Sequence, residues 1–225
     1  MADRLRERPR LPHRLWTVAT GVAGFVVFFV IAALVQARLL AGVDLAAAEA
    51  KQDLTSGLLD LWSAAVGIAV SGELSVVYAG IGVLLLWRAG VGRWSVAPMA
   101  FVALVPLEVI LKSAIHQPAV PLAFYRGVYD PLLNVVLQGT FPSGHAIRAG
   151  FLCTFLAIVL SARRGIAAWL APVGLGLLAV LMGLSRVYLG DHWLSDVVAG
   201  LILGAALALV VTPLVIERLR TERSG

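Results

Sequence analysis

The chain has 225 residues, of which 60% are hydrophobic and only 14% are charged, and its mean hydropathy is +0.92. One soluble core cannot bury so large an apolar fraction, which excludes an ordinary soluble domain and predicts a polytopic membrane protein. The formal net charge of +5 does not indicate nucleic-acid binding, because the cations are not gathered on a soluble domain and no basic-aromatic recognition motif accompanies them.

The predicted elements begin after an arginine-rich tail, residues 1–14. The apolar run that follows is longer than that of a signal peptide, so we expect a retained first span. Six segments have about the 20 residues needed to cross the hydrocarbon as helices. They lie at about 15–37, 64–87, 94–115, 144–162, 166–184 and 193–215. The sequence therefore predicts an all-α, six-transmembrane-helix bundle, a single domain over residues 1–225 with tails at 1–14 and 216–225.

Two of these segments have features of their own. Polar residues interrupt the start of the second, so residues 54–71 are a candidate for a separate interfacial helix. In the last, Gly200 and Gly204 form a G-x-x-x-G pair that permits close helix approach. Packing within the bundle and contact between two copies of the chain both explain this pair. The single cysteine, Cys153, cannot form an intrachain disulfide and is expected to be buried.

The distribution of Lys and Arg predicts the topology. With six spans both termini share a side, and the 18 cations divide between the two sides. Twelve lie on the side of the termini: Arg4, Arg6, Arg8, Arg10, Arg14, Arg88, Arg93, Arg163, Arg164, Arg218, Arg220 and Arg223. Six lie on the other side: Arg38, Lys51, Lys112, Arg126, Arg148 and Arg186. The positive-inside rule then places both termini in the cytoplasm and the long loops 38–63 and 116–143 outside.

Polar motifs open the fourth and sixth spans on this outer side. Pro142 stops the preceding segment, and Ser143, Gly144 and His145 begin the fourth span. Backbone N–H groups at such a helix start are expected to suit an anion. Ionisable groups near the hydrocarbon cost roughly 2.5 to 3.5 kcal/mol each. A cluster of them therefore indicates a functional site.

His192 and Asp196 are four residues apart and share one helix face. The carboxylate can accept the proton of one ring nitrogen and leave the other as a nucleophile. His145 is then available as general acid, and Arg186 has donors that match phosphate oxygens. Helix-capping histidines with an exposed Asp are the structural alternative.

Lys112 has two interpretations. It follows Glu108 by four residues, which is typical of a snorkelling lysine paired with a glutamate, or it contacts phosphate together with the other motif residues. A zinc site is disfavoured, because the ligand set is small and Lys112 and Arg186 repel a cation. We expect no metal and no cofactor.

These motifs resemble those of the type 2 phosphatidic acid phosphatase (PAP2) superfamily of integral membrane phosphatases, K-x6-R-P, P-S-G-H and S-R-x5-H-x3-D. The second is intact at 142–145, and the third runs intact from Ser185 to Asp196. The resemblance implies metal-free hydrolysis through a phosphohistidine on His192, with Asp196 orienting it and His145 acting as acid. It also implies phosphate binding by Lys112, Ser143, Gly144 and Arg186.

The first motif departs from the pattern, because Ala119 and Val120 replace its Arg and Pro. Arg126 and Arg148 are the candidate replacements, with His116 and Gln117 as weaker donors. The chain is then a compensated enzyme, an enzyme of altered substrate, or a protein that binds phosphate without turnover.

The expected function is hydrolysis of a lipid phosphate or lipid pyrophosphate at the outer leaflet of a bacterial inner membrane. Membrane lipids surround such a protein, and an amphiphilic substrate keeps its tails in the bilayer. A phosphotransferase of the same chemistry and a non-catalytic lipid-phosphate binding or transport protein are the alternatives.

Overall fold

The structure, a computed structural model, describes residues 13–54, 56–90, 92–126, 139–161 and 167–221. Within these ranges the chain forms α-helices and two short 3-10 helices, and no strand. The all-α prediction is confirmed. The predicted tail at 1–14 lies largely outside the described residues, whereas residues 216–221 of the predicted tail at 216–225 continue α8.

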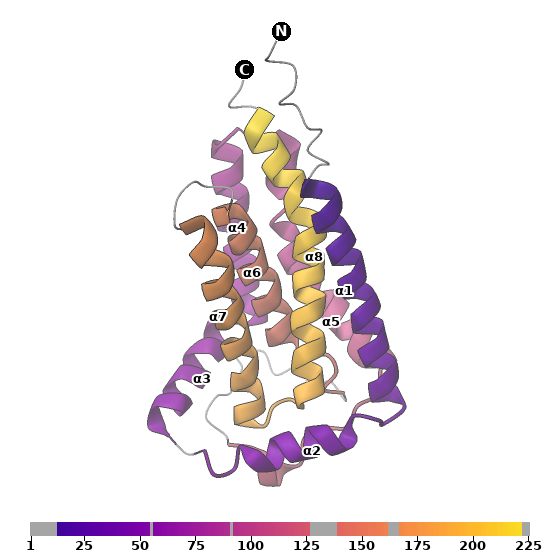
Figure 1. Cartoon of the computed structure of the whole chain (residues 1–225). Helices are drawn as coiled ribbons and strands as arrows, with labels where there is room; N and C mark the ends of the chain where they lie inside the picture. Colours follow the sequence, from indigo (N-terminus) through magenta and orange to yellow (C-terminus); the bar gives the residue numbers. More distant parts are fainter. Residues whose placement is uncertain (1–12, 55, 91, 127–138, 162–166, 222–225) are drawn as a thin grey trace.

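Six helices run along the length of one bundle (Figure 1). They are α1 (His13–Gln36), α4 (Gly72–Arg88), α5 (Met99–Ala114), α6 (Gly144–Ser161), α7 (Ala167–Leu189) and α8 (Leu194–Thr221). Helix α8 packs against α1 and α6, and α7 packs against α6. The start of α1 and the end of α8 lie at one end, and α2 (Ala41–Ala50) lies across the other end.

The six-span count is not confirmed. Among the residues that the structure describes, four helices are long and apolar enough to cross a membrane: Leu15–Gln36, Gly144–Ser161, Leu170–Leu189 and Leu194–Pro213. Helices α3 (Gly57–Ala69) and α4 add a fifth span if they are counted together, although they are bent by 57° at the break between them. Helix α5 has 16 residues, about 24 Å at 1.5 Å per residue, and is shorter than the hydrocarbon thickness of about 30 Å.

The break between α3 and α4 falls inside the predicted span at 64–87. Ser71 is the N-cap of α4, and its hydroxyl accepts the Leu74 N–H at 3.3 Å. A new helix thus begins there instead of continuing the old one. The separate helix expected within 54–71 is present as α3.

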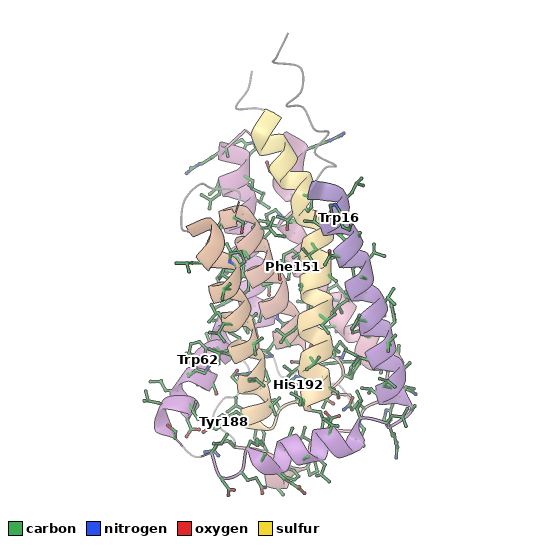
Figure 2. The ribbon with its side chains drawn as sticks, in the orientation of Figure 1. Trp16, Trp62, Phe151, Tyr188 and His192 are labelled. Atoms are coloured by element: carbon green, nitrogen blue, oxygen red, sulfur yellow. The ribbon has the colours of Figure 1, made fainter. Side chains whose placement is uncertain are left out.

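Large apolar side chains cover much of the outer surface. Val26, Phe29 and Val30 of α1 are each more than half exposed, as are Val173 and Leu177 of α7. An apolar surface of this extent is stable in lipid and not in water. Exposed Trp16 and Trp62 lie toward opposite ends of the bundle (Figure 2), as expected for residues at the two membrane interfaces.

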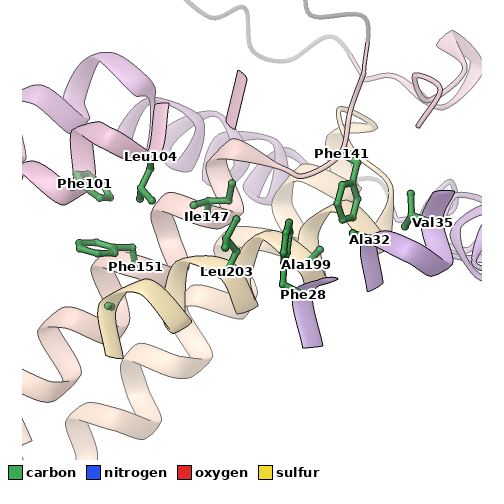
Figure 3. Close-up of a cluster of buried hydrophobic side chains, with 11 residues drawn as sticks. Phe28, Ala32, Val35, Phe101, Leu104, Phe141, Ile147, Phe151, Ala199 and Leu203 are labelled. Atoms are coloured by element: carbon green, nitrogen blue, oxygen red, sulfur yellow. The ribbon is translucent and has the colours of Figure 1, made fainter. Parts of the chain in front are cut away.

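Aromatic side chains fill the core near the P-S-G-H segment (Figure 3). Phe141 stacks on Phe28 of α1 with ring centroids 5.8 Å apart. Phe101 of α5 stacks on Phe151 of α6 at 5.6 Å. These contacts join α1, α5 and α6 around the segment that begins α6, and they fix the position of the motif.

The Gly200 and Gly204 face of α8 is used inside the chain. A Cβ at Gly200 would collide with the Ser143 carbonyl, and one at Gly204 with the Ile147 carbonyl. Helix α6 therefore covers this face. The predicted alternative, contact between two copies through these glycines, is wrong for this face, and packing within the bundle accounts for the pair.

Candidate active site

His192 and Asp196 meet where α8 begins, at the end of the bundle opposite the termini (Figure 2). The His192 Nδ1 and Asp196 Oδ2 atoms are 3.4 Å apart, and both side chains are buried. Asp196 Oδ2 also accepts the Trp193 N–H at 3.0 Å, so the carboxylate caps α8 while it holds the imidazole. This pairing assigns the proton to Nδ1 and leaves Nε2 as the basic nitrogen.

His145 is the second residue of α6, and its ring is hydrogen-bonded to the backbone carbonyl of Gly67 in α3. Its Nε2 atom is buried and has no hydrogen-bond partner within the described residues. Arg148, Arg186 and His192 all interact with it electrostatically. The structure thus brings both predicted catalytic histidines and two arginines into one cluster.

Arg186 is fully buried at the end of α7. Its Nη2 donates to the Ser63 carbonyl of α3, its Nε donates to Ser185 Oγ at 3.2 Å, and its Nη1 lies 3.4 Å from Asp191 Oδ2. Burial raises the pKa of Asp191, although the Arg186 charge opposes the rise. These contacts hold the guanidinium rigidly beside the histidines.

Ser143 forms hydrogen bonds with both α6 and α8. Its N–H donates to the Asp196 carbonyl at 3.1 Å, and its Oγ accepts the Ala146 N–H at 3.4 Å. The expectation that this residue offers a free backbone N–H is therefore wrong. The N–H groups of Gly144 and His145, the first two residues of α6, have no acceptor within the helix.

Lys112 and Arg148 both bind the carboxylate of Glu108. Lys112 Nζ lies 2.8 Å from Oε1, and Arg148 Nη1 lies 2.8 Å from Oε2. Arg148 Nε also donates to the Val70 carbonyl at 2.7 Å. The pairing of Lys112 with Glu108 is confirmed. Arg148 joins the same cluster, next to the turn that carries His145.

Comparison with known proteins identifies the family. A profile of the PAP2 superfamily matches residues 94–220, more than half of the chain. The chain belongs to the PAP2 superfamily. The predicted resemblance is confirmed.

Two curated relatives and one solved structure accompany this match. Phosphatidylglycerophosphatase B of Bacillus subtilis (strain 168) is 29% identical over 145 residues, 48% of this chain and 66% of the relative. Bacitracin transport permease protein BcrC of Bacillus licheniformis is 31% identical over 143 residues, 62% of this chain and 66% of the relative. The chain thus spans about two thirds of the length of each.

The crystal structure of the transmembrane PAP2-type phosphatidylglycerolphosphate phosphatase from Bacillus subtilis superimposes with a TM-score of 0.68. The superposition covers 86% of this chain and 94% of that one, at 22% identity. The fold is therefore shared.

Their contacts in the structure distinguish Arg126 from Arg148, the two candidates for the arginine missing from the first PAP2 motif. Arg126 pairs with Asp60 of α3 at 3.4 Å and lies over the Tyr188 ring at 4.6 Å. It is thus engaged at the first turn of α3, whereas Arg148 lies in the cluster with His145.

His116 and Gln117, the weaker donors, make their hydrogen bonds in another part of the fold. Gln117 Nε2 lies 3.2 Å from both Asp44 and Ser195. The His116 backbone is bonded to Gln36, and the residue lines a separate cavity of about 170 Å³. Neither is placed as a phosphate ligand.

Sequence reasoning missed two buried charged residues, Asp44 of α2 and Lys51, the residue that follows α2. Asp44 is buried and accepts the Ser195 N–H at 2.8 Å and the Ser195 hydroxyl at 2.7 Å. Lys51 is buried and donates to the carbonyls of Phe124 and Tyr188. Burial, followed by the charge of Arg126, lowers the pKa of Lys51 to about 8. A sequence signal is the spacing of Asp44 and Lys51, seven residues apart, which places both on one helix face.

Within the described ranges, His, Cys, Asp and Glu side chains do not gather in groups of three or more that could hold a metal ion. Metal-free chemistry stays a prediction. The free thiol of Cys153 is buried in α6, as expected.

Proposed function

We propose that this protein hydrolyses a lipid phosphate or lipid pyrophosphate, without a metal ion, through a phosphohistidine on His192. The observation that supports this most directly is the pairing of His192 with Asp196. It holds the ring by Nδ1 and leaves Nε2 to act. His145, with an unpartnered Nε2, and the buried Arg186 belong to the same cluster.

The chemistry takes two steps. His192 Nε2 attacks phosphorus, and an N–P bond forms as the bond from phosphorus to the leaving oxygen breaks. Protonated His145 gives its Nε2 proton to that oxygen. Water then attacks phosphorus as the N–P bond breaks, neutral His145 takes the proton of the water, and inorganic phosphate leaves while His192 is regenerated. Lys112, Arg148 and Arg186 with the Gly144 N–H stabilise charge on the phosphoryl oxygens, and the Ser143 hydroxyl is a further donor.

The substrate is an amphiphile that approaches from the membrane. The active site lies at one end of an apolar-surfaced bundle, so acyl or polyprenyl tails can stay in lipid while the head group reaches His192. The name of one relative, a phosphatidylglycerophosphatase, favours a lipid substrate. Phosphate release by purified protein in detergent with EDTA, offered several lipid phosphates, tests the function.

His192→Ala is expected to abolish turnover, and His116→Ala, a histidine outside the cluster, is expected to retain it. Rapid quenching with labelled substrate should trap an acid-labile, alkali-stable phosphoenzyme in the wild type and in His116→Ala, but not in His192→Ala. Phosphate release by His192→Ala equal to the wild type would remove His192 as nucleophile, and turnover that EDTA abolishes would contradict metal-free chemistry.

We further propose that the active site faces outward in a bacterial inner membrane, with both termini in the cytoplasm. The charge distribution, twelve cations against six, supports this orientation. Cys153 is buried, so single cysteines can be introduced against a quiet background. A membrane-impermeant maleimide should label Gln52→Cys on intact cells and Ala89→Cys only after lysis. The opposite pattern would invert the topology.

A protein that only binds lipid phosphate is the second candidate. The observation that favours it is the missing arginine of the first motif, replaced by Ala119. Loss of one such donor costs about 10² to 10³ in rate. Binding of lipid phosphate with no release of phosphate in the same assay would support this candidate. An alcohol as acceptor in place of water would make the protein a phosphotransferase.

A further inference from the structure

The carboxylate of Glu108 lies where a bound anion is expected. It contacts Gly144, the first residue of α6, so closely that a Cβ at that position would collide with it. The positive end of a helix favours an anion at this place. The Glu108 side chain is only 13% exposed. A negative group of the chain itself therefore lies beside the motif that carries His145.

The same carboxylate binds two cations that the proposed mechanism needs. Its two oxygens contact Lys112 Nζ and Arg148 Nη1, each at 2.8 Å. The four-residue spacing on α5 explains the Lys112 pair as ordinary helix-surface pairing. It does not explain Arg148, which comes from α6, or the contact with Gly144. Two cations and a glycine at a helix start, all around one carboxylate, resemble a phosphate site filled by an internal anion.

We propose that Glu108 occupies part of the phosphoryl site in the resting protein and makes the site selective for phosphate monoesters. The inference rests on the proposed function. A monoester group carries about −1.5 to −2 charges at pH 7, whereas a carboxylate or a phosphodiester carries one. A phosphomonoester or terminal pyrophosphate group therefore displaces Glu108 and takes Lys112 and Arg148. The singly charged phosphodiester head groups of bulk lipid do not.

This arrangement suits an enzyme surrounded by phosphodiester lipids. An open site with Lys112, Arg148 and Arg186 would attract any lipid phosphate at the membrane surface, because head groups are abundant there. The internal carboxylate neutralises part of that charge until a more highly charged group arrives. Glu108 acts here as a specificity residue, through the two cations it holds.

Orthovanadate, a phosphate analogue, and phosphatidylglycerol, a phosphodiester lipid, provide the test. In mixed micelles we expect Glu108→Gln to bind vanadate about tenfold more tightly than the wild type, because a like charge has left the site. Phosphatidylglycerol at rising mole fraction should inhibit phosphate release by Glu108→Gln and leave phosphate release by the wild type unaffected. Asp60→Asn is the matched control: it removes a carboxylate paired with Arg126 outside the cluster and should leave vanadate binding unchanged.

Weaker or equal vanadate binding by Glu108→Gln would overturn the proposal, since Glu108 would then only order Lys112 and Arg148. Glu108→Asp provides a second measurement if the Gln variant does not fold. Its shorter side chain cannot bridge both cations over Gly144, and vanadate should bind severalfold more tightly. If the wild type neither binds vanadate nor releases phosphate, the proposed function is contradicted as well. If the wild type releases phosphate but Glu108→Gln does not bind vanadate more tightly, only the proposal for Glu108 is contradicted.

Discussion

Replacement of Asp44 by alanine should reduce turnover, although Asp44 lies on α2 and outside the catalytic cluster. Its carboxylate accepts three hydrogen bonds, from the Ser195 N–H at 2.8 Å, the Ser195 hydroxyl at 2.7 Å and Gln117 Nε2 at 3.2 Å. Ser195 is in the first turn of α8, between His192 and Asp196. Asp44 therefore holds in place the turn that pairs His192, the proposed nucleophile, with the Asp196 carboxylate.

The magnitude follows from these bonds. A hydrogen bond to a charged group contributes about 1.5 to 3 kcal/mol, and an orphaned buried donor costs about 1 to 3 kcal/mol. Ser195 Oγ and Gln117 Nε2 still lie 3.2 Å apart, so the Ser195 N–H is the main orphan. Burial raises the pKa of Asp44 despite the Ser195 hydrogen bonds, which means that desolvation offsets part of their gain. We expect Asp44→Ala to lower the free energy of unfolding by about 2 kcal/mol.

Asp44→Asn should have a smaller effect and lower the free energy of unfolding by about 1 kcal/mol. Asn keeps an oxygen for the Ser195 N–H, and its new N–H₂ group can meet the Gln117 Oε1, which is buried and has no hydrogen-bond partner within the described residues. A turn of the Gln117 amide would then satisfy both groups. The two variants thus differ by the contacts of one side chain.

Steady-state phosphate release and thermal unfolding in detergent are the assays. We expect kcat of Asp44→Ala to fall about 10- to 100-fold with KM little changed, because a misplaced catalytic group slows the chemical step. Glu49→Ala, an exposed carboxylate on the same helix, should match the wild type. If Asp44→Ala keeps the wild-type kcat, or if Asn is as damaging as Ala, the positioning role of α2 is refuted.

Two further predictions concern Lys51 and the arginines. The folded state holds Lys51 with its pKa lowered from 10.5 to about 8, so it binds fewer protons than the unfolded chain between these values. Stability should rise with pH across that window, and thermal unfolding of Lys51→Met should lack this rise; an equal rise in both would contradict it. Arg148→Ala should lower kcat/KM by about 10² or more, whereas Arg126→Ala should stay within about threefold. Equal effects in phosphate release would show that neither replaces the missing arginine selectively.

The motifs could be found in the sequence because their chemistry is local. His192 and Asp196 are one helical turn apart, and the P-S-G-H segment is continuous, so spacing alone predicts the pairing and the helix start. The long apolar runs likewise predicted the starts of α1, α6, α7 and α8 closely, whereas α7 and α8 continue beyond their predicted ends to Leu189 and Thr221. Both features depend on residues near one another in the chain.

What the sequence did not predict depends on contacts between distant segments. Asp44 and Ser195 are 151 residues apart, and Glu108 and Arg148 are 40 apart. The four-residue spacing predicts the pair of Glu108 with Lys112, but it does not predict that Arg148 joins them. Hydropathy also merged residues 64–87 into one span, because a serine cap at Ser71 changes the direction of the chain while hardly altering the average hydrophobicity.

The broken helix gives the proposed catalytic side chains neutral partners in addition to the carboxylates of Glu108, Asp191 and Asp196. The carbonyls of Ser63, Gly67 and Val70 in and after α3 accept hydrogen bonds from Arg186, His145 and Arg148, respectively. At a helix end the last four carbonyls lack intrahelical donors, and α3 ends at Ala69. If α3 continued into α4 as a straight span, the carbonyls of Gly67 and Val70 would bind residues 71 and 74 instead. His145 and Arg148 would then lose these acceptors. The break thus gives the cations neutral partners that orient them and leave their charge available for phosphate.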